Sequence, residues 1–238
     1  MSHHHVTRSR SLHLLALCAV LLVAGCSTEA AGTTVRRSGL PVSFSFASDC
    51  AGYTGTEGGA TSECRDGEFR VTVRHPGPNV RPEQDYLFRF DDSPPGLAVS
   101  ADVRLDRGRV QDQALGVACV GSGYQQPAQE YIFAVGGGIA AIFRRDETLA
   151  KSKMLKQLAY QPVAGMSTSA TTHIEGECAT LSGGTTLLVM KVNGREVLRE
   201  YTPTRFPRFV ATDLWMFTLS GGAFAFDNLS AKAESRIQ

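Results

Sequence analysis

A strict alternation of apolar and polar residues over Gly96 to Gly108 limits the possible folds of this chain more than any other feature. Leu97 and Val99 lie in one phase of the pattern, and Ser100 and Asp102 lie in the other. Successive side chains of a β-strand point to opposite faces, so the pattern predicts a strand with one buried and one solvated face. Similar alternation predicts strands near residues 41–48, 68–75, 86–91, 113–121, 130–135, 139–145, 172–181, 185–192, 195–202, 213–220 and 223–231.

Short turns separate these segments. Asn193-Gly194 carries the positive φ angles that a tight hairpin needs, and Gly136 to Gly138 separates two apolar runs. Many short strands joined by such turns predict an all-β fold built as a two-sheet antiparallel sandwich. Only Glu147 to Tyr160 is ambiguous, and there we expect irregular structure with a short edge strand.

The N-terminus has the features of an export signal. Arg8 and Arg10 precede an apolar run from Leu12 to Ala24 that is short for a membrane span. The run ends at Cys26 in a sequence that resembles the lipobox of bacterial lipoproteins. We therefore predict a signal peptide over 1–25, a lipidated Cys26 with a flexible tether over 26–39, and a globular domain over 40–238.

An uncleaved anchor and a plain secretory signal are the alternatives to lipidation. Lipidation would hold the domain on the extracytoplasmic face of the cell membrane, since two or three acyl chains bind a bilayer durably. Arginine outnumbers lysine, and alanine and glycine are abundant, which is typical of a GC-rich, for example actinobacterial, genome. Without Arg8 and Arg10 the net charge is −1, which is not typical of a nucleic-acid-binding protein.

Four cysteines follow the predicted lipidation site. An even number in an exported chain predicts two disulfides, and although three pairings are possible we expect Cys50–Cys64 and Cys119–Cys178. The second pair lies in strand-patterned segments, in phase with core residues. A zinc site is disfavoured because the chain beyond the signal has no Cys-x-x-Cys spacing and only two histidines. The small number of histidines also argues against hydrolases that use a Ser-His or Cys-His pair.

Several stretches carry a resemblance to a known superfamily. They are Asp66 to Arg70, Gly116 to Cys119, Ile174 to Cys178, Leu188 to Gly194 and Ala225 to Leu229. In this order they resemble concanavalin A-like domains, the lectin/glucanase and laminin-G-like superfamily. The resemblance implies a jelly roll that belongs to a group of sugar-binding lectins, glucanases and adhesion modules, so it narrows function only weakly.

The chain departs from the glucanases of this superfamily at the catalytic strand. Their Glu-x-Asp-x-x-Glu pattern is missing, and the nearest equivalent, Glu175 and Glu177, lacks a third acid, so we expect solvated residues there and name no catalytic residue. Asp227 is a weak candidate for calcium, which some relatives bind through a terminal-strand aspartate. A backbone-capping role is the alternative, and we expect no other metal or cofactor.

Sugars stack on exposed aromatic rings, and jelly rolls usually bind them on the concave sheet. The chain's only tryptophan, Trp215, is therefore the first candidate, with Phe217 in the same phase and Tyr124 and Tyr160 as possible neighbours. Alternatively, Trp215 fills the core or covers a sheet edge. The sequence thus favours a membrane-anchored, non-catalytic module that binds polysaccharide, cell wall or an envelope partner. A divergent glycoside hydrolase and a structural accessory protein are the other hypotheses.

Overall fold

A computed structural model of the chain describes residues 35–38, 40–47, 54–57, 59–74, 83–121, 129–163 and 168–234. The chain divides into two compact units, Met1–Gly32 and Thr33–Gln238, and the described residues belong to the second. The predicted signal peptide, Cys26, Cys50 and Tyr124 lie outside them. Within the described ranges, no helix is both long and apolar enough to cross a bilayer.

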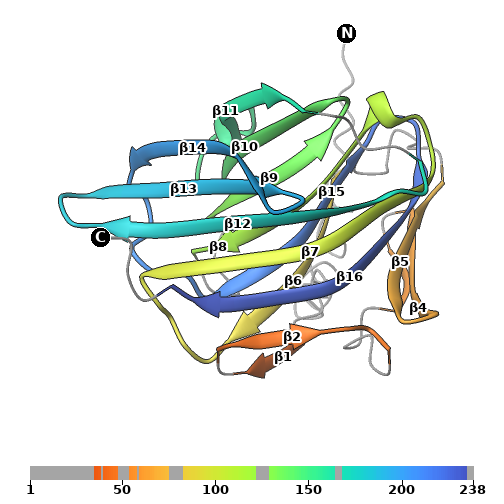
Figure 1. Cartoon of the computed structure of the whole chain (residues 1–238), viewed down its shortest axis with the longest axis horizontal. Helices are drawn as coiled ribbons and strands as arrows, with labels where there is room; N and C mark the ends of the chain where they lie inside the picture. The colour runs from red at the N-terminus through yellow and green to blue at the C-terminus, as the bar shows by residue number, and fades with distance from the viewer. Residues whose placement is uncertain are drawn as a thin grey trace, which may run out of the picture. The chain divides into compact units, whose positions relative to one another are not determined.

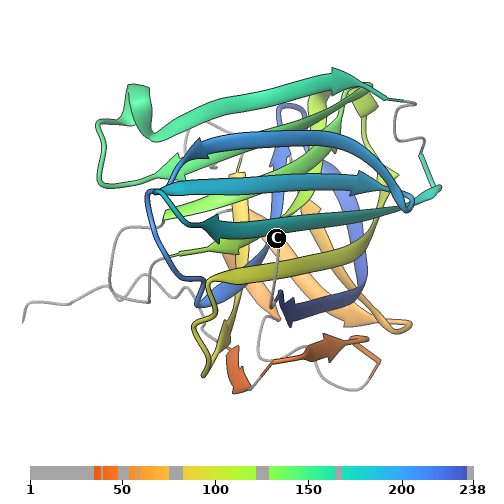
Figure 2. The ribbon, with the colours of Figure 1, turned by 60° about the vertical axis from the view of Figure 1, so that its left-hand side comes forward.

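The described residues form two sheets packed face to face (Figures 1 and 2). The seven-stranded sheet contains, in spatial order, β1 (Val35–Ser38), β6 (Glu83–Phe90), β15 (Ala211–Thr218), β8 (Gln113–Val120), β9 (Gln129–Gly136), β10 (Ile139–Asp146) and β11 (Leu155–Pro162). The nine-stranded sheet contains β14 (Arg195–Pro203), β13 (Thr185–Val192), β12 (Thr171–Leu181), β7 (Gly96–Arg107), β16 (Gly222–Ala233), β5 (Glu68–Val73), β4 (Ala60–Arg65) and β3 (Gly55–Glu57), with β2 (Val42–Phe44) paired to β16.

This architecture confirms the predicted all-β, two-sheet sandwich. The paired strands are antiparallel except for β1, which runs parallel to β6. Two short helical turns, η1 (Val110–Asp112) and α1 (Lys151–Met154), lie in connections between strands. The alternation seen in the sequence has its expected cause, because one face of each sheet is buried against the other sheet.

The core lies between the sheets. Leu97 and Val99 of β7 and Leu214 and Met216 of β15 belong to one buried apolar cluster. A disulfide between Cys119 on β8 and Cys178 on β12 joins the two sheets within this cluster, which confirms the predicted pair. Cys64 is also disulfide-bonded, but its predicted partner Cys50 lies outside the described residues.

Two sequence-based expectations need correction, and one stretch for which no strand was predicted forms strands. Val35–Ser38, the end of the predicted flexible tether, forms β1 because it pairs with β6. The Gly/Thr-rich stretch between Cys50 and Cys64 contributes β3 and part of β4, which pair with each other at the sheet edge. Finally, the ambiguous region contains the expected edge strand, β11, but this strand is eight residues long rather than short, and it follows the helix α1 and pairs with β10.

Candidate functional site

Strand β15 presents different side chains to the two faces of the seven-stranded sheet. Leu214 and Met216 enter the core between the sheets, so the alternating residues Asp213, Trp215 and Phe217 lie on the opposite face, here called the outer face. Trp215 is therefore not part of the core between the sheets, but it is buried in a second apolar cluster, which agrees with the alternative that it has a packing role.

A second apolar cluster covers this outer face. Trp215 packs with Ala118, Ile132 and Ala134, and Phe143, Phe217 and Ala114 pack against them. The ring centroids of Trp215 and Phe143 are 6.2 Å apart, and those of Trp215 and Phe217 are 6.4 Å apart with nearly parallel planes. Three aromatic rings thus pack together in a second apolar cluster outside the main core.

Small residues form the floor beneath these rings. One row of directly opposed residues crosses the sheet from Trp215 through Gly116, Ala134 and Ala141 to Tyr160. With neighbouring strands about 4.8 Å apart, this row spans about 19 Å. The short side chains let the indole of Trp215 extend over the sheet toward Phe143, which lies three strands away.

The two ends of this row differ in exposure. The side chain of Trp215 is 2% exposed, whereas that of Tyr160, on the edge strand β11, is 62% exposed. Phe217 is half-buried in the neighbouring row. The structure therefore brings three of the four predicted aromatic residues to one face, and the fourth, Tyr124, lies outside the described residues.

Gly116 is needed for this row to form. A Cβ atom at this position would collide with the backbone carbonyl oxygen of Phe133 on the neighbouring strand. A glycine thus permits the close approach of β8 and β9 below the aromatic rings.

A charged group borders the apolar cluster on the same face. Glu130 on β9, Arg145 on β10 and Asp213 on β15 each lie two residues from a member of the cluster, and all three are buried. Arg145 Nε lies 2.5 Å from Glu130 Oε1, although this pair is not aligned as a hydrogen bond, and Nη2 lies 3.9 Å from Asp213 Oδ2.

One guanidinium therefore contacts two carboxylates. Since its nitrogens belong to a single planar group, the two carboxylates lie within about 9 Å of each other. Carboxylates separated by about 5 to 9.5 Å can act as a catalytic pair on a glycosidic bond. No catalytic residue was predicted from the sequence, and this group could not be found there, because its members are far apart in the chain and only strand pairing brings them together. The sequence offered one indication: each of the three charged residues lies two positions from an apolar residue of the same strand, so the two side chains point to the same face.

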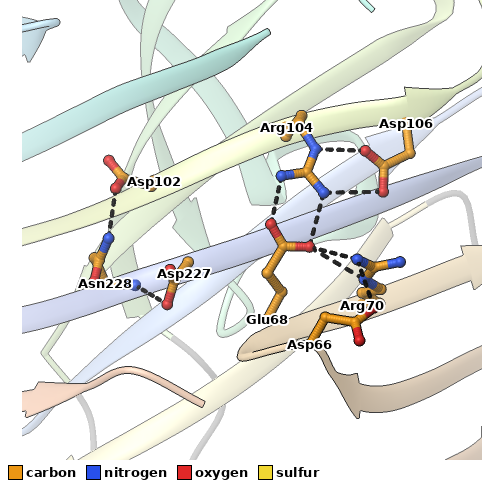
Figure 3. Close-up of polar contacts among 8 residues, drawn as sticks. All are labelled: Asp66, Glu68, Arg70, Asp102, Arg104, Asp106, Asp227 and Asn228. Carbon is orange, nitrogen blue, oxygen red and sulfur yellow. Dashed lines mark hydrogen bonds and ion pairs between the residues drawn. The ribbon is translucent and has the colours of Figure 1, made fainter. Parts of the chain in front are cut away.

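The outer face of the nine-stranded sheet carries a different group, a network of ion-paired side chains (Figure 3). Arg104 donates hydrogen bonds to both Glu68 and Asp106, and Arg70 donates to Glu68. The Arg104 guanidinium lowers the pKa of Glu68, despite an opposing effect of burial. This network keeps the carboxylate ionised and leaves the face polar.

Asp227, the weak calcium candidate, lies at the edge of this network (Figure 3). Its Oδ1 accepts a 2.7 Å hydrogen bond from the backbone N–H of Asn228, which has a positive φ angle of 50°. The opposing Asp102 accepts hydrogen bonds from the Asn228 side chain and pairs with His173. Across the described ranges, no three His, Cys, Asp or Glu residues are grouped to hold a metal ion. The contacts of Asp227 are those of the capping alternative.

Glu175 and Glu177 lie on this same polar face. Lys191, on the neighbouring strand β13, contacts both carboxylates. Burial raises the pKa of Glu175, but the hydrogen bond and charge of Lys191, the hydrogen bond with Glu177 and the charge of Lys232 together lower it by more. The pair is thus neutralised by a lysine and lies on the opposite side of the sandwich from the aromatic cluster.

In sequence, the chain matches no protein-family profile and no curated protein. In structure, it is similar to a carbohydrate-binding module, CBM66, from Bacillus subtilis, with a TM-score of 0.51 and 12% identity over 76% of this chain and 96% of that one. An endo-β-1,4-glucuronan lyase from the fungus Trichoderma reesei gives a TM-score of 0.54 and 11% identity, covering 77% and 91%. A Bacillus licheniformis β-glucanase gives 0.52 and 10%, covering 82% and 98%.

The chain has a two-sheet, antiparallel jelly-roll fold. These similarities confirm the fold that the sequence resemblance implied. At 10 to 12% identity they establish the fold alone, and residue roles must be argued from this chain.

Proposed function

We propose that the outer face of the seven-stranded sheet binds a polysaccharide. The observation that carries the proposal is the row that joins Trp215 to the exposed Tyr160 over Gly116, Ala134 and Ala141, beside the charged group of Arg145. A ligand site typically combines apolar and aromatic walls with a few placed polar groups, as this face does. The solved structures of the same fold include a carbohydrate-binding module, a polysaccharide lyase and a glucanase.

Trp215 and Tyr160 would contribute differently. Because Trp215 is 2% exposed, we expect a ligand to meet Tyr160 and the half-buried Phe217 first. The indole of Trp215 would support the Phe217 ring from below and contact sugar only if its neighbours move. Its role as a stacking platform stays a prediction.

We further propose that Cys26 carries lipid and holds the domain on the extracytoplasmic face of a membrane. The lipobox-like sequence supports this proposal. The buried Cys119–Cys178 disulfide agrees with it, because structural disulfides persist in oxidising compartments. Mass spectrometry of the native protein should find an acylated Cys26 as the first residue, whereas an unmodified terminus upstream of it would refute the anchor.

A matched pair of tyrosines tests the glycan proposal. Tyr160 on β11 and Tyr201 on β14 are 62% and 57% exposed, but only Tyr160 lies on the proposed face. Binding to immobilised mixed-linkage β-glucan, alginate and cell-wall glycan is compared for Tyr160→Ala and Tyr201→Ala. We expect the first variant to lose about tenfold in affinity, which corresponds to about 1.4 kcal/mol of binding free energy. An equal effect of both variants, or no binding to any of the three glycans, would overturn the proposal.

A second candidate function is cleavage of the bound glycan. It is favoured by one observation, the pairing of Glu130 and Asp213 through Arg145. One acid would protonate the glycosidic oxygen, and the other would attack the sugar or activate water. Release of new reducing ends that stops in Glu130→Gln and persists in Glu175→Gln, on the opposite face, would support cleavage. Bound glycan that stays intact would leave binding as the function.

A further inference from the structure

The connection between β10 and β11 forms an exposed corner, here called the lysine corner, made of residues 147–156. It includes the short helix α1 and lies at one end of the edge strand β11 (upper left in Figure 2). Leu149 and Leu155 are 39% and 40% exposed, and Lys153 and Lys156 are also exposed. Apolar and cationic side chains thus share one protruding segment.

Lysine is concentrated in this corner. Three of the five lysines of the chain lie here, at positions 151, 153 and 156, together with a single acid, Glu147. The other two lysines, Lys191 and Lys232, each form ion pairs with glutamates. Among the described residues, no ion pair to Lys153 or Lys156 is found. The corner therefore presents uncompensated positive charge.

We propose that the lysine corner docks the domain on an anionic lipid surface. An anionic membrane interface attracts lysines electrostatically, and it also accepts leucine side chains at the boundary with the acyl chains. An acidic polysaccharide would attract the lysines but offers no apolar layer for Leu149 and Leu155. The combination of exposed leucines with lysines therefore favours lipid over an acidic polymer.

The position of the corner is compatible with anchoring through Cys26. Strands β1 and β11 form opposite edges of one sheet, six strand spacings apart, which is about 29 Å. The nine residues from Cys26 to Val35 can reach about 30 Å when extended. The anchor and the lysine corner can thus contact one membrane together, which would restrict the orientation of the domain.

Docking is tested on protein that lacks the acyl chains proposed for Cys26, and no glycan is present. The outcome is therefore independent of the proposed function. The probe is a set of vesicles of phosphatidylcholine with or without phosphatidylglycerol. The protein is Thr33–Gln238, the compact unit that carries both sheets, after its cooperative unfolding has been verified. One variant carries Lys153→Ser with Lys156→Ser, and another carries Leu149→Ser with Leu155→Ser. A control carries Leu219→Ser with Lys232→Ser, two exposed positions elsewhere.

We expect the unit to bind the anionic vesicles and not the neutral ones. The lysine variant should lose about 30-fold in partitioning, at about 1 kcal/mol per lysine, and the leucine variant about tenfold, while the control keeps its binding. Equal losses in the control, or equal binding to neutral vesicles, would overturn the proposal. Binding that needs the lysines but not the leucines, and that dextran sulfate beads reproduce, would identify an acidic polymer as the partner and also overturn it.

Discussion

Removal of the Cys119–Cys178 disulfide should cost this fold a large part of its stability. The bond joins β8 of one sheet to β12 of the other and closes a loop across 59 residues of sequence. Cross-linking such a loop restricts the unfolded chain, and the chain-entropy relation gives about 4 kcal/mol for this length. Both cysteines are fully buried, and alanine at these positions removes only the two sulfur atoms and adds no polar group.

The assay is urea unfolding of the Cys119→Ala, Cys178→Ala double variant against the unaltered chain, followed by circular dichroism. With a slope of about 2 to 3 kcal/mol per molar urea for a domain of this size, a loss of about 4 kcal/mol lowers the midpoint by about 1.3 to 2 M. A midpoint shift below about 0.3 M would refute the reasoning, because the bond would then not restrict the unfolded chain appreciably.

Three further predictions concern polar and backbone positions. Glu68→Gln should destabilise by about 1 kcal/mol at pH 7. Because Arg104 lowers the pKa of Glu68 below 4.5 in the folded state, the stabilisation is present above pH 4.5 and lost as the pH falls through the folded value, so the unfolding midpoints of variant and unaltered chain should converge in acid. Gly116→Ala should lower the melting temperature by several degrees, since its Cβ meets the backbone of Phe133, and an unchanged melting temperature would contradict that contact. Arg145→Met should lower the free energy of unfolding, measured in urea, by about 3 kcal/mol, because two buried carboxylates lose their shared cation. An unchanged free energy of unfolding would argue against the contacts of Arg145 with Glu130 and Asp213.

Local pattern was sufficient to predict most of the longer strands of this fold. Alternation of apolar and polar residues, such as Leu97 and Ser100, predicts a half-buried strand directly. The pattern is contained in a few neighbouring residues and does not depend on which strand lies beside it. The phase of Cys119 and Cys178 likewise predicted that both side chains face the interior. Short edge elements such as β3 were missed, because an exposed strand that pairs on one side needs no apolar residues.

Strand pairing between distant segments could not be predicted in the same way. The phase of Trp215 was clear, but both phases of β15 are apolar, so the pattern did not say which one faces the core. The row from Trp215 to Tyr160 and the meeting of Glu130 with Asp213 depend on the order of β15, β8, β9 and β10 in the sheet. That order is set by packing across long sequence separations.

The most direct test of the central claim uses Trp215 as a reporter, since it is the only tryptophan in the chain. Its fluorescence is followed while mixed-linkage β-glucan, alginate or solubilised cell-wall glycan is added. If the outer face of the seven-stranded sheet binds glycan, at least one of them should produce a saturable change in emission that Tyr160→Ala weakens and Tyr201→Ala preserves. Glycan binding detected by calorimetry with unchanged Trp215 emission, or no binding of any of the three, would contradict the claim.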